Sequence, residues 1–126
     1  MDRYIFATQI NVLPQIKFWH WQTEEHAVHV ALGDLYDQLS ELLDTIVEAW
    51  QGKTQTRITV KHNRSAWQPS DWESAETAAT FVSRLIENTV EEINELKKLD
   101  SYGDIINLLE ELNGVLAKSM YPLTLK

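Results

Sequence analysis

The chain has no cysteine among its 126 residues. It therefore cannot form a disulfide, an iron–sulfur cluster or a thiolate zinc site, and it offers no cysteine nucleophile. Any metal ion must be held by His, Asp and Glu, which suits iron, manganese or zinc. No apolar run reaches the roughly 20 residues of a membrane span, and the first residues do not form a signal peptide. We expect a single cytoplasmic domain over residues 1–126, with no membrane partner.

Basic residues are few, since 11 Lys and Arg stand against 19 Asp and Glu, for a formal net charge of −8. Nucleic-acid binding depends on cations that neutralise phosphates, so this balance argues against a nucleic-acid partner. Four of the cations crowd into the segment 52–74, namely Lys53, Arg57, Lys61 and Arg64. Around them, residues 57–61 alternate like a short extended segment. A solvated loop, a subunit contact and an anion-binding patch all remain open for this segment.

Glycine and proline are also scarce, with four and three residues, and long stretches keep the 3.6-residue apolar period of helices. We predict helices at about Arg3–Gln22, Glu24–Gln51, Glu73–Leu99 and Tyr102–Ala117. The second helix should bury Leu32, Leu35, Leu39, Leu42, Leu43, Ile46 and Trp50. The third helix should bury Ala79, Phe81, Leu85, Val90, Ile93 and Leu96. The fold class is therefore all-α, a four-helix bundle with a long connection between helices two and three.

The ends and breaks of these helices follow from single residues. Pro14 predicts that the first helix is kinked near Asn11 or divided into two short helices. Thr23 is expected to cap the second helix and Gly52 to end it. The last residues, Met120–Lys126, contain a proline and are expected to form a tail or a subunit contact. Within the second helix, Gly33 indicates either a close helix approach or a tolerated weak spot.

Potential metal ligands lie on the second helix, beside its apolar face. Asp44 and Glu48 are one turn apart, so both can reach one ion. His29 lies about 22 Å from Asp44 along the axis, because a helix rises 1.5 Å per residue. These side chains cannot share an ion within one chain, since ligands sit about 2 Å from a metal. Two copies packed antiparallel about a two-fold axis would bring His29 of one chain near Asp44 and Glu48 of the other, with His20 close to its own His29.

Three motifs between Phe18 and Gly52 resemble the Dps group of ferritin-like proteins. They are His20-Trp21, His29 with Leu35-Tyr36-Asp37, and Asp44 with Glu48 four residues later. The resemblance implies a ferritin-like bundle in which iron is bound by His20 and His29 of one subunit and Asp44 and Glu48 of its two-fold mate. It also implies a ferroxidase, which oxidises iron(II) with peroxide or oxygen, and mineral storage in a twelve-subunit cage.

Further residues around this site have weaker predicted roles. His26, Asp37 and Glu41 share the ligand stripe and are candidate accessory ligands or cation guides. The segment from His20 to Asp34 also resembles short ferritin-like proteins of unassigned function from tailed phages, which would place the protein in the host cytoplasm.

Two alternatives complete the predictions. An intrachain di-iron site needs Glu-x-x-His pairs on two helices, but the histidines are His20, His26, His29 and His62, so helices three and four have none. Their glutamates are therefore interpreted as outer-face acids. A different class of function is a metal-free helical oligomerisation or interaction module of a phage or bacterium.

The five tryptophans are expected in core or interface packing, with Trp67 and Trp72 capping the long connection.

Overall fold

The computed structural model describes residues 1–61 and 68–125, and these residues form an all-α bundle of four helical rods. The first rod consists of α1 (Asp2–Ala7), the π-helical turn η1 (Thr8–Val12) and α2 (Leu13–Gln22). The other three rods are α3 (His26–Thr54), α4 (Ala75–Lys97) and α5 (Gly103–Thr124). The described part contains no β-strand. The predicted fold class is confirmed.

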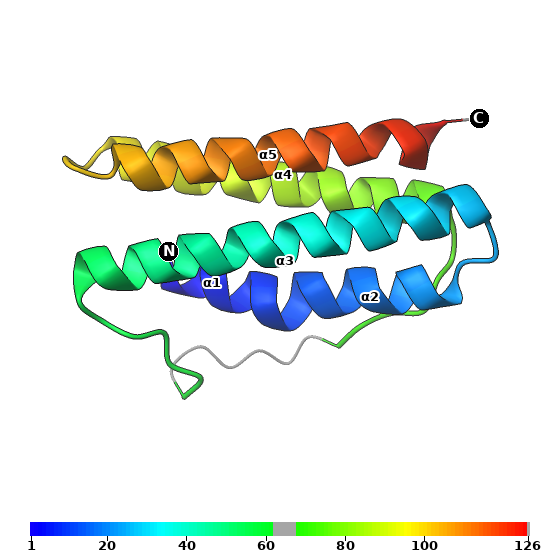
Figure 1. The fold of residues 1–126 in the computed structure, drawn as a ribbon, viewed down its shortest axis with the longest axis horizontal. Helices are drawn as coiled ribbons and strands as arrows, with labels where there is room; N and C mark the ends of the chain where they lie inside the picture. Colours follow the sequence, from blue (N-terminus) through cyan, green and yellow to red (C-terminus); the bar gives the residue numbers. More distant parts are fainter. Residues whose placement is uncertain (62–67, 126) are drawn as a thin grey trace.

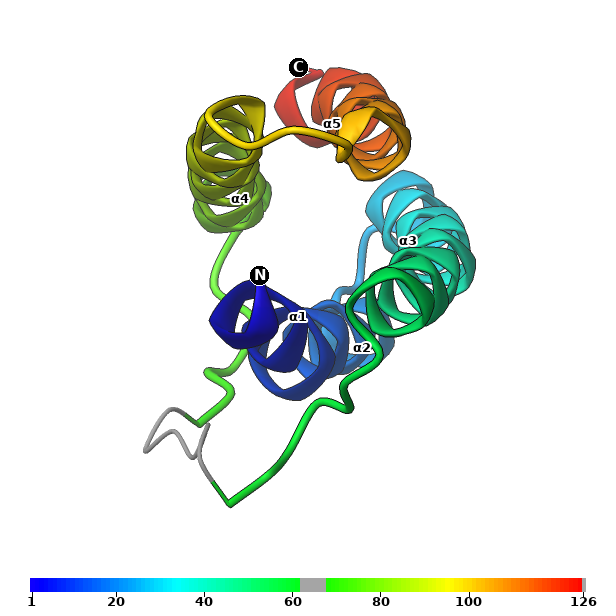
Figure 2. The same cartoon turned by 90° about the vertical axis from the view of Figure 1, so that its left-hand side faces the viewer.

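The rods form two antiparallel pairs, the first rod with α3 and α4 with α5 (Figure 1). The carboxyl end of α3 and the start of α4 lie at opposite ends of the bundle, so these two helices run in the same direction. Seen end-on, the rods surround a common centre (Figure 2). Two consecutive helices that run in the same direction need a connection that returns along the length of the bundle. This topology explains the long connection predicted between the second and third helices.

One apolar core joins all the rods. Leu39 and Ile46 of α3 and Ile105, Leu109 and Leu116 of α5 have no exposed surface. Leu32, Leu35, Leu39 and Leu43 of α3 are buried as predicted. Leu42 and Trp50, which were also predicted to be buried, are only partly buried against the core. No helix in the described residues is long and apolar enough to cross a membrane.

The prediction for the core face of α4 is wrong at Val90, which is 43% exposed. Thr89, one residue earlier, is completely buried in its place. The Thr89 hydroxyl donates to the Leu85 carbonyl at 2.8 Å and lies 2.7 Å from the Tyr4 hydroxyl. These hydrogen bonds satisfy the polar group inside the core and so remove the usual cost of burying it.

The first rod is irregular where the sequence predicted, because the π-helical turn η1 joins two short α-helices, α1 and α2. The π-helical turn η1 contains Asn11 and directly precedes α2, so Pro14 lies at the first positions of a new α-helical segment. Proline is tolerated there because an amide at a helix start has no intrahelical partner. The chain thus continues as one rod through its proline.

Both predicted ends of α3 are wrong. Thr23 does not cap this helix, because its hydroxyl accepts from the Glu25 amide at 3.3 Å, outside the helix that begins at His26. At the other end α3 continues through Gly52 and stops where Gln55 adopts the left-handed conformation, with φ of 55°. The Gln55 side chain donates to the Gly52 carbonyl at 2.6 Å. Side-chain capping, rather than glycine, ends the helix.

The end of α5 also differs from the prediction, because the helix runs through Pro122 to Thr124 instead of ending in a tail. Proline removes one amide donor in the final turn. Leu123 is only 3% exposed, and the Thr124 hydroxyl donates to the Met120 carbonyl at 2.6 Å. Burial of the leucine favours the helical continuation over a free tail.

The last part of the long connection is held along α2. Gln15, which is 1% exposed, accepts from the Ser70 amide at 2.8 Å and donates to the Ser70 carbonyl at 2.8 Å. Trp19 donates to the same carbonyl at 3.0 Å and packs edge-on against Trp72. Trp72, near the end of the long connection, therefore packs against Trp19 of α2. Residues 56–61 form no strand, and the predictions for His62, Arg64 and Trp67 lie outside the described residues.

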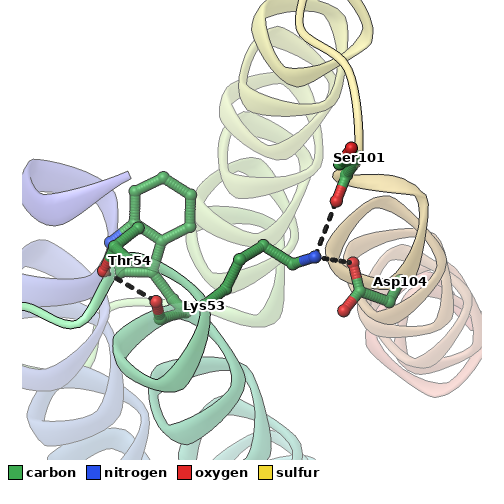
Figure 3. A network of polar contacts seen from close by, with 5 residues as sticks. Lys53, Thr54, Ser101 and Asp104 are labelled. Atoms are coloured by element: carbon green, nitrogen blue, oxygen red, sulfur yellow. Dashed lines mark hydrogen bonds and ion pairs between the residues drawn. The ribbon is translucent and has the colours of Figure 1, made fainter.

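Lys53 joins the carboxyl end of α3 to the turn between α4 and α5 (Figure 3). Its ammonium group donates to the Ser101 carbonyl at 2.6 Å and pairs with the Asp104 carboxylate at 3.2 Å. Desolvation raises the pKa of Asp104, but the hydrogen bond and charge of Lys53, together with backbone hydrogen bonds at Ile105 and Asp104, outweigh it, so the pKa is lowered. This contact ties together the end of the bundle opposite the α2–α3 turn.

Candidate metal centre

The short turn between α2 and α3 brings His20 and His29 together. Their rings stack with centroids 4.0 Å apart and planes 14° apart. The Nδ1 atom of His20 lies 2.7 Å from the His29 carbonyl, and the Nδ1 atom of His29 lies 2.7 Å from the His20 carbonyl. A carbonyl oxygen can only accept, so both Nδ1 atoms carry the proton. In the neutral rings both Nε2 atoms therefore keep a lone pair, as a metal ligand requires.

The local sequence explains why this pair forms. Only Thr23–Glu25 separate α2 from α3, so the last turn of one helix faces the first turn of the other. The His20 carbonyl lies in the final turn of α2, where carbonyls lack helical partners, and the His29 ring supplies a donor. The pair therefore also serves as a structural contact between the two helices.

The stacked arrangement limits how the two rings can bind metal. Imidazole binds an ion along an in-plane lone pair, at about 2 Å from the nitrogen. Rings that stack at 4.0 Å with nearly parallel planes cannot both direct such a lone pair to one ion. As they stand, His20 and His29 can serve neighbouring ions but cannot chelate the same one.

His26, the predicted accessory residue, lies one turn before His29 and is exposed. Its ring centroid is 6.4 Å from that of His29. The imidazoles thus gather at the α2–α3 turn, His20 from the end of α2 and His26 and His29 from the start of α3.

The predicted carboxylate ligands lie elsewhere on α3. Asp44 and Glu48 are exposed, and they form no hydrogen bond or ion pair with any residue that the structure describes. Along the helix, Asp44 is about 22 Å and Glu48 about 28 Å from His29. Asp37 and Glu41 are also exposed. Across the described ranges, no three His, Cys, Asp or Glu side chains of one chain gather closely enough to hold a metal ion.

An exposed apolar stripe on the first rod was not predicted. Ile10, Phe18 and Trp21 are 45%, 43% and 62% exposed, and Pro14 lies between them at helical spacing. The spacing i, i+4, i+8, i+11 on the side opposite the core residues was the sequence signal for this second apolar face. Beside it, the Lys17 ammonium lies 4.6 Å from the centroid of the Tyr36 ring of α3.

Exposed acids occur along the whole outer face of the α2–α3 pair. Glu24 and Glu25 lie in the turn beside the three histidines, and Asp37, Glu41, Asp44 and Glu48 follow along α3. An antiparallel copy of this face would lay the imidazoles of one chain over the carboxylates of the other.

A protein-family model described as a family of unknown function, DUF5856, matches residues 20–123. The chain belongs to this family. The matched range includes His20, His29, Asp44 and Glu48. No curated protein and no solved structure matches the chain.

Proposed function

We propose that this member of the DUF5856 family is a Dps-like, ferritin-like protein that binds iron(II) between the subunits of a two-fold dimer and oxidises it to iron(III). The observation that carries the proposal is the reciprocal pairing of His20 and His29. A histidine that ligates a metal commonly donates its other ring nitrogen to a carbonyl, which fixes the tautomer and the ring orientation. Both rings already meet this condition.

A second copy supplies what one chain lacks. Along α3, the carboxylate of Asp44 is about 22 Å and that of Glu48 about 28 Å from His29, too far for a shared ion. An antiparallel two-fold arrangement brings them to the histidines of the partner, and the carboxylates of the partner to the histidines of this chain. The exposed stripe of Ile10, Phe18 and Trp21 lies on the same helix pair and would lose water on assembly.

The chemistry follows from the ligand types. Carboxylates stabilise the higher charge of iron(III), and neutral imidazoles leave coordination positions open for an oxidant. Each iron(II) loses one electron, and a peroxide molecule accepts two electrons and two protons to leave as two waters. His20 and His29 serve separate neighbouring ions, and His26, Asp37 and Glu41 guide cations to them. Manganese or redox-inert zinc would compete for the same ligands.

The test is iron(II) titration under anaerobic conditions, followed by addition of peroxide or oxygen while the absorbance of iron(III) is recorded. Replacing Asp44 and Glu48 together by Ala should reduce the oxidation rate at least tenfold, since it removes half of the ligands. The matched control replaces Glu87 and Glu91, two exposed acids with the same spacing on α4. It makes the same charge change and should leave the rate unaltered.

Two results would reject the proposal. Equal oxidation rates in the two double variants would show that Asp44 and Glu48 are not ligands. Absence of iron(II) oxidation by the unaltered protein would show that it is not a ferroxidase. The mass from size-exclusion light scattering tests the assembly, because a strict monomer has no intersubunit site. The same measurement distinguishes a dimer from a larger cage that could store mineral.

A metal-free oligomerisation module is the second candidate function, and the exposed apolar stripe of the first rod favours it. A stable dimer that binds no iron would support this candidate. Replacing Trp21, the most exposed residue of the stripe at 62%, by Glu should then dissociate the dimer. Replacing Asp44 and Glu48 should have no effect on its mass.

A further inference from the structure

The only glycine of α3 that contacts the histidine pair is Gly33. A Cβ atom at this position would lie 2.8 Å from Cε1 and 3.1 Å from Nδ1 of His20. A Cβ at Gly52, in the same helix, would meet nothing within 4 Å. Neither glycine has a positive φ, so the backbone does not require glycine at position 33. Glycine weakens a helix interior relative to alanine, which indicates that the free space at Gly33 has a use.

We propose that Gly33 is a positioning residue that holds the His20 ring in its ligand orientation. The ring is confined on three sides: α3 lies below it, the His29 ring is stacked at 4.0 Å, and its Nδ1 atom is bonded to the His29 carbonyl at 2.7 Å. A methyl group at position 33 would fill the space between α3 and the ring and push the ring away from the helix. The ring can then escape only by losing the stacking or the hydrogen bond.

The consequence concerns the metal-binding nitrogen. The Nδ1 bond places the proton of His20 on Nδ1 and leaves the lone pair on Nε2. When the ring turns away from the His29 carbonyl, nothing fixes the tautomer, and Nε2 carries the proton in a large fraction of molecules. Loss of such an orienting contact typically reduces metal affinity by about 10–100-fold. This inference rests on the proposed function for its ligand role, whereas the orientation itself can be measured without metal.

The experiment compares Gly33→Ala with Gly52→Ala as the matched control. Long-range proton–nitrogen correlation spectra of the metal-free protein report the tautomer of each imidazole. Gly33→Ala should shift a large fraction of His20 from the Nδ1–H to the Nε2–H signature, and Gly52→Ala should retain the Nδ1–H signature. Titration with zinc alone should show about 10–100-fold weaker binding for Gly33→Ala and unaltered binding for Gly52→Ala. Retention of the His20 tautomer in Gly33→Ala would overturn the proposal.

A third variant separates positioning from folding. Gly33→Ala should lower the melting temperature through its clash with the ring. In a His20→Ala background the clash is absent, so adding Gly33→Ala should leave the melting temperature equal or higher. A further decrease would show that the glycine is required for another reason and would overturn the proposal. Failure of the unaltered protein to oxidise iron(II) would reject the proposed function alone, because the spectra of the metal-free protein decide the role of Gly33 by themselves.

Discussion

The long connection depends on one buried amide, and replacing Gln15 by Met tests this dependence. Methionine has nearly the same length and fits the buried, 1% exposed position, but it cannot pair with the main chain. Gln15 forms three hydrogen bonds with Ser70, to its amide at 2.8 Å, its carbonyl at 2.8 Å and its hydroxyl at 3.1 Å. The substitution removes all three and changes little else.

The magnitude follows from these contacts. Each hydrogen bond contributes about 1 kcal/mol net. Ser70 is exposed, and Trp19 still donates to its carbonyl at 3.0 Å, so water and Trp19 recover part of the loss. We expect Gln15→Met to lower the free energy of unfolding by about 2 kcal/mol. At roughly 4 °C per kcal/mol for a chain of this length, the melting temperature should decrease by about 8 °C.

The assay is thermal and urea unfolding followed by far-ultraviolet circular dichroism, with Gln22→Met as the matched control. Gln22 contacts the same segment, accepting from the Trp72 amide at 2.7 Å, but it is exposed. Its loss should cost no more than about 0.5 kcal/mol. Limited tryptic cleavage after Lys61 should also accelerate in Gln15→Met. The reasoning is refuted if Gln15→Met is no less stable than Gln22→Met.

Two further predictions concern titration. Burial raises the pKa of Tyr4 to about 12, whereas a tyrosine in the unfolded chain ionises near 10. The free energy of unfolding should therefore keep its full value below pH 10 and decrease by roughly 3 kcal/mol as the pH rises toward 12. Tyr4→Phe removes the hydrogen bond to Thr89, worth about 1 kcal/mol, and its stability should no longer decrease in this alkaline range. The control Tyr121→Phe changes a 72% exposed residue and should behave like the unaltered protein. Urea unfolding at pH 8 and pH 11 measures both effects. Lys53→Met should return the lowered pKa of Asp104 toward 3.8, as followed by carboxyl carbon resonances between pH 2 and 6, and an unmoved resonance would contradict the role given to Lys53.

Local rules predicted the helices well because their signal is local. The 3.6-residue apolar period identified all four rods, and the long second connection followed from their spacing. The same rules failed at helix ends, where two interactions compete. At Pro122 the missing amide hydrogen predicted the end of the helix, but the helix continues to Thr124 because burial of Leu123 stabilises its last turn. At Gly52 the glycine argued for an end, and the Gln55 side chain supplied the cap three residues later.

The candidate site divides in the same way. Residue types and the helical rise alone establish that His29 cannot share an ion with Asp44 in one chain, because the distance of about 22 Å depends only on backbone geometry. The stacking of His20 on His29, the proton on each Nδ1 and the contact at Gly33 depend on how two helices meet. No local pattern encodes that meeting, just as none encodes the Tyr4–Thr89 contact between the first rod and α4. The sequence by itself determined the helices and the ligand spacing; tertiary packing decided orientation, because side chains distant in sequence set it.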